Sequence, residues 1–124
     1  MPWYSTEHVE DISILRLKGE ASTRQFQWLG GLDGLLMRGR RHLVVSLEEV
    51  VIHGPADAGF VVAVTRRVED VGGDVVFVAP KDAHAQKILR QTGFSKVFPF
   101  AATVAAGSAR VQPALHSGSQ VDGR

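Results

Sequence analysis

The chain has 124 residues, no cysteine and a formal net charge of +1, and 44% of its residues are hydrophobic. This length suits one domain with one core. The near-neutral charge argues against nucleic acid or anionic lipid as partners, because both are bound through clustered positive charge. Without cysteine the chain can form no disulfide and no thiolate site, which fits a cytoplasmic protein. No apolar window approaches the ~20 residues of a membrane span.

The first elements in chain order are two strands. Residues 13–18 alternate apolar and polar side chains, with Ile14 off the pattern, and end at Gly19. This period of two predicts a strand with one buried face. Residues 3–8 are a weaker strand candidate, and a turn at residues 10 and 11 would pair them with residues 13–18.

A helix is predicted between residues 22 and 38, where apolar side chains recur at spacings of three and four. Ser22 or Thr23 could cap it. Interior glycines such as Gly30 and Gly31 each cost a helix roughly 1 kcal/mol relative to alanine, so we expect packing to hold it together. The predicted buried face consists of Phe26, Leu29, Leu32, Leu35 and Leu36.

The second half of the chain alternates strands and helices. Residues 43–47 form a short apolar run typical of a strand at the sheet centre. A helix follows over residues 55–71, with an apolar stripe that ends at Gly72 and Gly73. Further along, we expect a strand at 74–79, a helix at 80–92, and a short edge strand at 97–100 because of its proline. Glycine and serine dominate after residue 106, so we assign a domain to residues 1–106 and a disordered tail to residues 107–124.

This alternation predicts an α/β fold with a mixed, mostly parallel sheet of about five strands and about four helices. Four segments carry a further signal: "ILRLKGEAS", "HLVVSLEEVVI", "AGFVVAVTRRVEDVGGDVVFVAP" and "ILRQTGFSKVFPF". In this order they cover most of residues 6–105 and resemble the STAS domain, the family that includes the bacterial anti-sigma factor antagonists.

The resemblance departs from the family at the segment that leads into the long helix. There the family usually reads Asp-Ser-Ser/Thr-Gly, and a kinase phosphorylates the second hydroxyl residue. Alignment on the glycine pair that ends this helix places Gly54, Pro55, Ala56 and Asp57 at these four positions. Alanine has no hydroxyl, so Ala56 cannot accept a phosphate.

Two interpretations of Asp57 remain open at this stage. Pro55 and Asp57 in the first turn favour helix initiation, because proline suits the first helical position and a carboxylate suits the positive end of the helix dipole. Alternatively, Asp57 acts as a permanent substitute for phosphoserine, although a carboxylate carries less charge than phosphate and lies one residue away.

The resemblance implies a non-enzymatic interaction module that binds a regulatory protein through the 53–59 loop and the following helix. The expected partner is a serine kinase that acts as an anti-sigma factor, or another STAS protein, and a homo-oligomer is conceivable. An alternative is an accessory or scaffold subunit of an ABC-type transporter or of a larger assembly. We expect Val62 to be exposed. The predicted partner-binding residues are His53, Pro55, Ala56, Asp57, Val62, Ala63 and Arg66.

An enzyme is the third class considered. His53, Asp57 and His84 are the only histidine and carboxylate positions near the expected strand-to-helix loops, where open α/β sheets bind ligands. We expect His53 to be a partly buried packing residue, His84 to be exposed, and the Ser46 hydroxyl to bond to backbone. Since no nucleophile, base and acid stand together in this pattern, and no phosphate-binding glycine loop occurs, we predict no catalytic residue, cofactor or metal.

Overall fold

The computed structural model describes residues 2–111 of the chain. Its five strands form one sheet in the order β1-β2-β3-β4-β5. The first pair is antiparallel and the other three pairs are parallel, which confirms the predicted mixed, mostly parallel sheet with β3 at its centre. The strands are β1 (Tyr4–Val9), β2 (Ile12–Glu20), β3 (His42–Val51), β4 (Asp74–Val78) and β5 (Phe100–Ala101).

Helices connect the parallel strands, as the alternation predicts. Five α-helices lie in the described residues, and four of them have seven or more residues. They are α1 (Ala21–Met37), α2 (Gly59–Asp70), α3 (Ala83–Gln91), α4 (Phe94–Val97) and α5 (Val104–Arg110), and a 3₁₀ turn, η1 (Pro55–Ala58), precedes α2.

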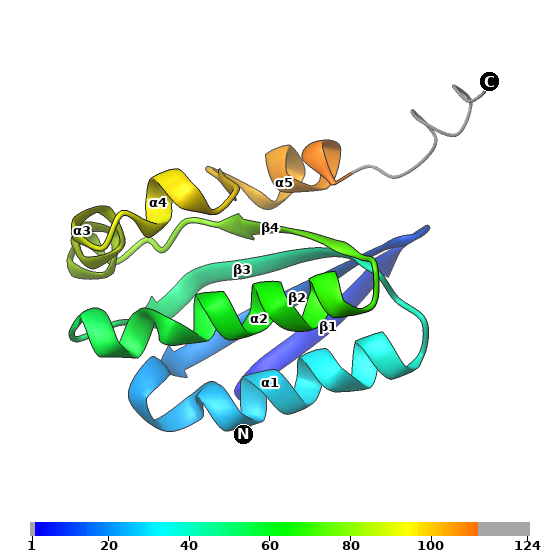
Figure 1. Cartoon of the computed structure of the whole chain (residues 1–124), viewed down its shortest axis with the longest axis horizontal. Helices are drawn as coiled ribbons and strands as arrows, with labels where there is room; N and C mark the ends of the chain where they lie inside the picture. Colours follow the sequence, from blue (N-terminus) through cyan, green and yellow to red (C-terminus); the bar gives the residue numbers. More distant parts are fainter. Residues whose placement is uncertain (1, 112–124) are drawn as a thin grey trace.

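The sheet has a core on each face. Helices α1 and α2 lie together over one face, while α5 lies on the opposite side of the sheet (Figure 1). Leu15 and Leu17 of β2 belong to the larger core beneath α1 and α2, whereas Ile12 and Ile14 belong to the smaller one beside α5. The two covered faces explain why Ile14 breaks the alternation of apolar and polar residues.

Helix α5 approaches the sheet closely through a glycine. Gly107 is buried, and a Cβ atom there would lie 3.2 Å from Cγ1 of Val44. Val111, which follows the helix, is fully buried. The domain boundary predicted at residue 106 therefore falls inside an ordered helix, and the part of the predicted tail from residue 112 onward lies outside the described residues.

The predicted face of α1 is wrong at one position. Phe26 is 85% exposed, and Trp28, which is 1% exposed, fills the core instead. At about 100° per residue, Phe26 lies far around the helix from Leu32 and Leu35. The indole N–H of Trp28 donates to the carbonyl oxygens of Trp3 and Lys18, at 2.9 and 3.2 Å. Neither predicted cap acts, because Glu20 occupies the N-cap position without a side-chain hydrogen bond.

The last predicted strand is also corrected. Residues 94–97 form α4, in which Val97 is 74% exposed, and only residues 100 and 101 extend the sheet. The carbonyl oxygen of Pro99 accepts a hydrogen bond from the Phe77 N–H at 2.9 Å. Proline thus stands at the start of a very short edge strand, where its missing N–H does no harm.

Candidate functional site

The 53–59 loop lies where the chain leaves β3 and enters α2. Ile52 before it and Ala58 and Phe60 around its end are buried, so both ends are anchored in the core. Between these anchors His53, Pro55, Ala56 and Gly59 are exposed, while Gly54 and Asp57 are half-buried. The loop is therefore an exposed surface on a fixed base.

Asp57 closes the loop on itself. One of its carboxylate oxygens, Oδ2, accepts a hydrogen bond from the His53 N–H at 3.1 Å, and its own N–H donates to the Gly54 carbonyl at 3.0 Å. These two bonds make the turn that places Pro55 at the start of η1. The geometry supports the helix-initiation interpretation of Asp57, because the carboxylate has a structural partner within its own loop.

His53 joins three segments that are distant in sequence. Its ring Nε2 lies 3.3 Å from Oε1 of Glu20 at the end of β2, and its carbonyl oxygen accepts from Nε2 of His84 in α3 at 3.2 Å. The His53 side chain is 59% exposed, so the prediction of a partly buried packing histidine is wrong. Strand β3 ends at Val51, two residues before the histidine, so the His53 ring projects from the loop and not from the sheet.

The remaining predicted contacts lie on α2. Arg66 is exposed, whereas Val62 and Ala63 are half-buried, and Ala63 packs against the main core. Val62 therefore offers less free surface than expected. Val62, Ala63 and Arg66 all lie in the first half of α2, which directly follows the loop.

Sequence reasoning missed Glu20 as a neighbour of the loop. Glu20 also borders a hollow of about 510 Å³, and in its lining the Arg24 guanidinium lies 3.8 Å above the centre of the Trp3 ring. No local signal could identify this neighbour, because β2 and β3 meet there only through the register of the parallel pair.

Ser46 lies inside β3, and its hydroxyl is already hydrogen-bonded. Ser46 is 2% exposed, and its hydroxyl donates to Oε1 of Glu48 at 3.0 Å and accepts from the Glu48 N–H at 3.3 Å. The hydroxyl thus bonds a side chain as well as the predicted backbone. Within residues 2–111 no three histidine or carboxylate side chains come close enough to share a metal ion.

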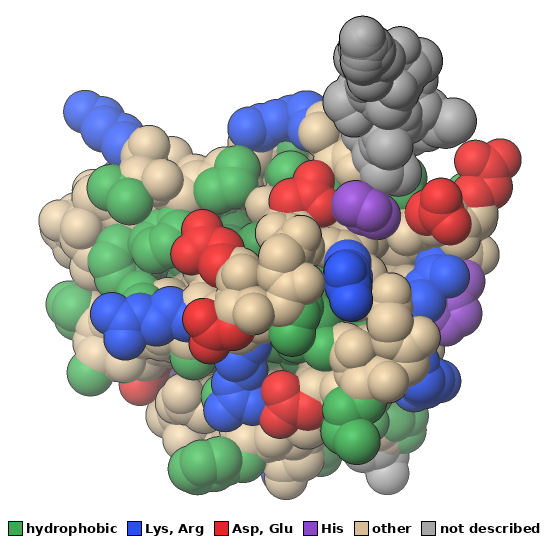
Figure 2. All heavy atoms as spheres, turned by 45° about the vertical axis from the view of Figure 1, so that its right-hand side comes forward, with side chains coloured by type: hydrophobic (Ala, Val, Ile, Leu, Met, Phe, Trp, Pro, Cys, Tyr) green, Lys and Arg blue, Asp and Glu red, His purple; other side chains and the backbone are tan. Residues whose placement is uncertain are grey.

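The surface charge is mixed on the side of the molecule that Figure 2 presents. Basic and acidic side chains alternate there, with hydrophobic ones between them, rather than forming an area of one sign. In the described part of the chain, no helix combines the length and apolar character needed to span a bilayer.

These features define a class: a small mixed α/β domain that exposes one hydrogen-bonded loop beside the carboxyl ends of its parallel strands. The sequence model of the STAS domain matches residues 4–107, and the chain belongs to the STAS domain family. This confirms the resemblance found in the sequence. The comparison with curated proteins gave no match.

Solved structures share the fold at low sequence identity. An anti-sigma factor antagonist from Mycobacterium paratuberculosis is 17% identical, with a TM-score of 0.72, over 88% of this chain and 92% of that one. A second, from Thermotoga maritima, is 20% identical with a TM-score of 0.70, over 88% and 94%. The Bacillus anti-sigma factor antagonist SpoIIAA, in its unphosphorylated form, is 18% identical with a TM-score of 0.63, over 90% and 99%. At these identities the likeness establishes the fold.

Proposed function

We propose that this chain is a non-enzymatic interaction module of the anti-sigma factor antagonist type. It binds a regulatory protein of the cytoplasm, either a serine kinase that acts as an anti-sigma factor or another STAS protein. The contact is made through the 53–59 loop and the first turns of α2. The observation that supports this proposal is the exposure of His53, Pro55 and Ala56 on a loop whose backbone is already hydrogen-bonded.

Binding at this face is not switched by phosphate on residue 56. Ala56 is exposed in η1 and carries only a methyl group, so no phosphoryl acceptor stands at the position that the family modifies. Phosphorylation works by adding charge and acceptor oxygens to a surface. In this chain such control must come from the partner or from another module.

The test compares two alanine-to-arginine variants. Ala56→Arg places a long charged side chain in the proposed face. Ala109→Arg places the same side chain at an exposed position of α5, on the other side of the sheet. A partner is first identified by affinity purification from the native cell, then purified and titrated against each variant. We expect Ala56→Arg to weaken binding at least tenfold and Ala109→Arg to leave it unchanged.

Equal binding by both variants would move the interface to another face. Capture of a transporter ATPase as the specific partner would instead favour the accessory-subunit alternative. A second variant, Ala56→Ser, tests the alignment itself. If the partner is a kinase of the expected kind, mass spectrometry should find phosphate on residue 56 of this variant and none on the wild-type loop.

A further inference from the structure

The two edges of the sheet differ in how open they are. Strand β5 has two residues and follows Pro99, so it offers little backbone to another strand. Strand β1 has six residues with no proline or lysine, and it pairs with β2 in one continuous register. The side chains of residues 5–9 are all exposed. Proteins usually block a long regular edge with charged side chains, proline or a bulge. Strand β1 has no proline and no bulge, and its one carboxylate, Glu7, already forms an ion pair with Arg16 at 3.2 Å.

The backbone groups on the free side of β1 can be identified from one hydrogen bond. The Lys18 N–H donates to the Trp3 carbonyl at 2.9 Å, so residues 3 and 18 are a hydrogen-bonded pair. Such pairs alternate along an antiparallel ladder. Residues 3, 5, 7 and 9 therefore direct their N–H and C=O groups to β2, while those of Tyr4, Thr6 and His8 point away from the sheet.

We propose that β1 pairs with β1 of a second copy of this chain, antiparallel and about a twofold axis at Thr6. In this register Thr6 faces Thr6 of the second copy, and Tyr4 faces His8. Every outward donor and acceptor of these three residues then finds a partner, and the two sheets become one. A symmetric interface of this kind closes after two copies.

Charge and backbone chemistry select this register over its neighbours. At the twofold on Thr6, each Glu7 lies opposite Ser5 of the second copy, so no like charges face each other. A shift by two residues in one direction places Glu7 opposite Glu7, and directly opposed like charges destabilise a strand pair. A shift in the other direction places Pro2 opposite His8, and proline lacks the N–H that the ladder needs.

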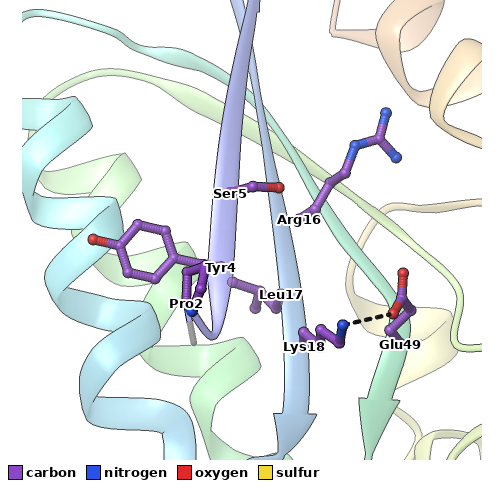
Figure 3. Close-up of a pocket in the computed structure, with 7 residues that line it drawn as sticks. All are labelled: Pro2, Tyr4, Ser5, Arg16, Leu17, Lys18 and Glu49. Atoms are coloured by element: carbon purple, nitrogen blue, oxygen red, sulfur yellow. Dashed lines mark ion pairs between the residues drawn. The ribbon is translucent and has the colours of Figure 1, made fainter.

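The side chains at this edge also suit strand addition. Figure 3 shows Tyr4 directed toward α1 and Ser5 toward the opposite side of the sheet, beside Arg16. On the Ser5 side lies a hollow of about 230 Å³ whose lining includes Pro2, Ser5 and Arg16. In the proposed register, Val9 of the second copy comes to this hollow. Val9 is 48% exposed in the single chain, so pairing would shield it from water.

This inference does not depend on the proposed function. The 53–59 loop follows β3, and β2 separates β3 from β1, so the pairing leaves both loops of the dimer free. A dimer would present two identical faces to a partner. Failure of the loop variants above would not affect the edge, and failure of the edge variants would not affect the loop.

The first test uses engineered cysteines, because the chain has none of its own. In Thr6→Cys the two α-carbons would be about 5.5 Å apart, as in any hydrogen-bonded antiparallel pair, which lies within disulfide reach. In the control Ser5→Cys, the two cysteines are two residues out of register and beyond that reach. We expect mild oxidation to convert most of Thr6→Cys, and little of Ser5→Cys, to a covalent dimer. Equal cross-linking of the two variants would overturn the proposal.

The second test measures mass in solution by light scattering from low to high micromolar concentration. The wild type should approach twice the 13.4 kDa chain mass. Thr6→Lys should remain a monomer, since the twofold sets its two ammonium groups against each other, while Thr6→Val should dimerise like the wild type. Circular dichroism checks that each variant is folded. A monomeric wild type, or a dimer that survives Thr6→Lys, would overturn the pairing.

Discussion

Two adjacent glycines in α1 should respond in opposite ways to the same substitution. Gly30 is exposed, and a Cβ atom there meets nothing within 4 Å. Gly31 is buried, and its Cβ would lie 2.6 to 2.8 Å from three ring atoms of Tyr4. Heavy atoms cannot stay that close, so in Gly31→Ala the Tyr4 ring has to shift from its place against α1. Gly30→Ala changes only the helix.

The magnitude follows from two opposing effects. Alanine is better than glycine in a helix interior by about 1 kcal/mol, and this gain applies to both positions. Overpacking a well-filled contact costs about 1–3 kcal/mol, and this cost applies only at Gly31. We expect Gly30→Ala to raise the free energy of unfolding by about 1 kcal/mol, and Gly31→Ala to lower it by up to about 2 kcal/mol.

The assay is urea unfolding, followed by the fluorescence of the two tryptophans, of which Trp28 is buried. A double-mutant cycle isolates the contact: in a Tyr4→Ala background the ring is gone, so Gly31→Ala should become as stabilising as Gly30→Ala. If Gly31→Ala stabilises the wild type as much as Gly30→Ala does, the close packing of α1 on β1 through Gly31 is refuted.

Three further substitutions test other parts of the structure. Gly73→Ala should destabilise by about 3 kcal/mol, since its Cβ would collide with the Arg41 carbonyl oxygen, which is backbone and cannot swing aside; a midpoint in urea equal to that of the wild type would contradict this. Phe26→Ser should change the free energy of unfolding by less than about 0.5 kcal/mol, because Phe26 is outside the core. A large loss of stability would instead support the buried position predicted from the sequence. Asp57→Ala should cost about 1 kcal/mol, the net worth of an ordinary hydrogen bond, because it removes the acceptor of the His53 N–H. Asp57→Asn, which keeps an oxygen there, should cost less, and thermal melting compares the two.

The periodic segments of this fold could be predicted because burial follows their period. The apolar stripe predicted for α2 places Phe60, Val61, Val64 and Val68 in the core, but the last residue of that predicted stripe, Val71, is 38% exposed. Gly72, with a φ of 76°, follows the end of this helix, as the glycine pair predicts. For α2 the hydrophobic period alone therefore identified the buried face.

The misses occur where an element depends on a partner far away in sequence. The helical spacing places Trp28 outside the predicted buried face. Its burial depends on the carbonyl oxygens of Trp3 and Lys18, which accept hydrogen bonds from the indole N–H. Gly107 resembles part of a polar tail, yet its missing side chain is what lets α5 approach Val44. Such contacts leave no periodic trace in the local sequence.

The candidate face was also predictable in part: its position followed from the sequence, but its long-range contacts did not. The position of the 53–59 loop follows from the order of strand and helix, and the exposure of Pro55 and Ala56 agrees with a surface role. The exposure of the His53 ring and its contact with Glu20 could not be predicted from the sequence. They depend on the residue at which β3 ends and on β2 being its neighbour in the sheet. Which of these residues contact a partner stays a prediction.

The bond between the Asp57 carboxylate and the His53 N–H has a kinetic consequence. A loop that is already fixed in shape loses little conformational freedom when another molecule docks on it. Association with such a surface should be a single step, whose observed rate rises linearly with ligand concentration and shows no plateau. Breaking the bond with Asp57→Ala would introduce an ordering step, which stopped-flow measurements would detect as saturation of the rate.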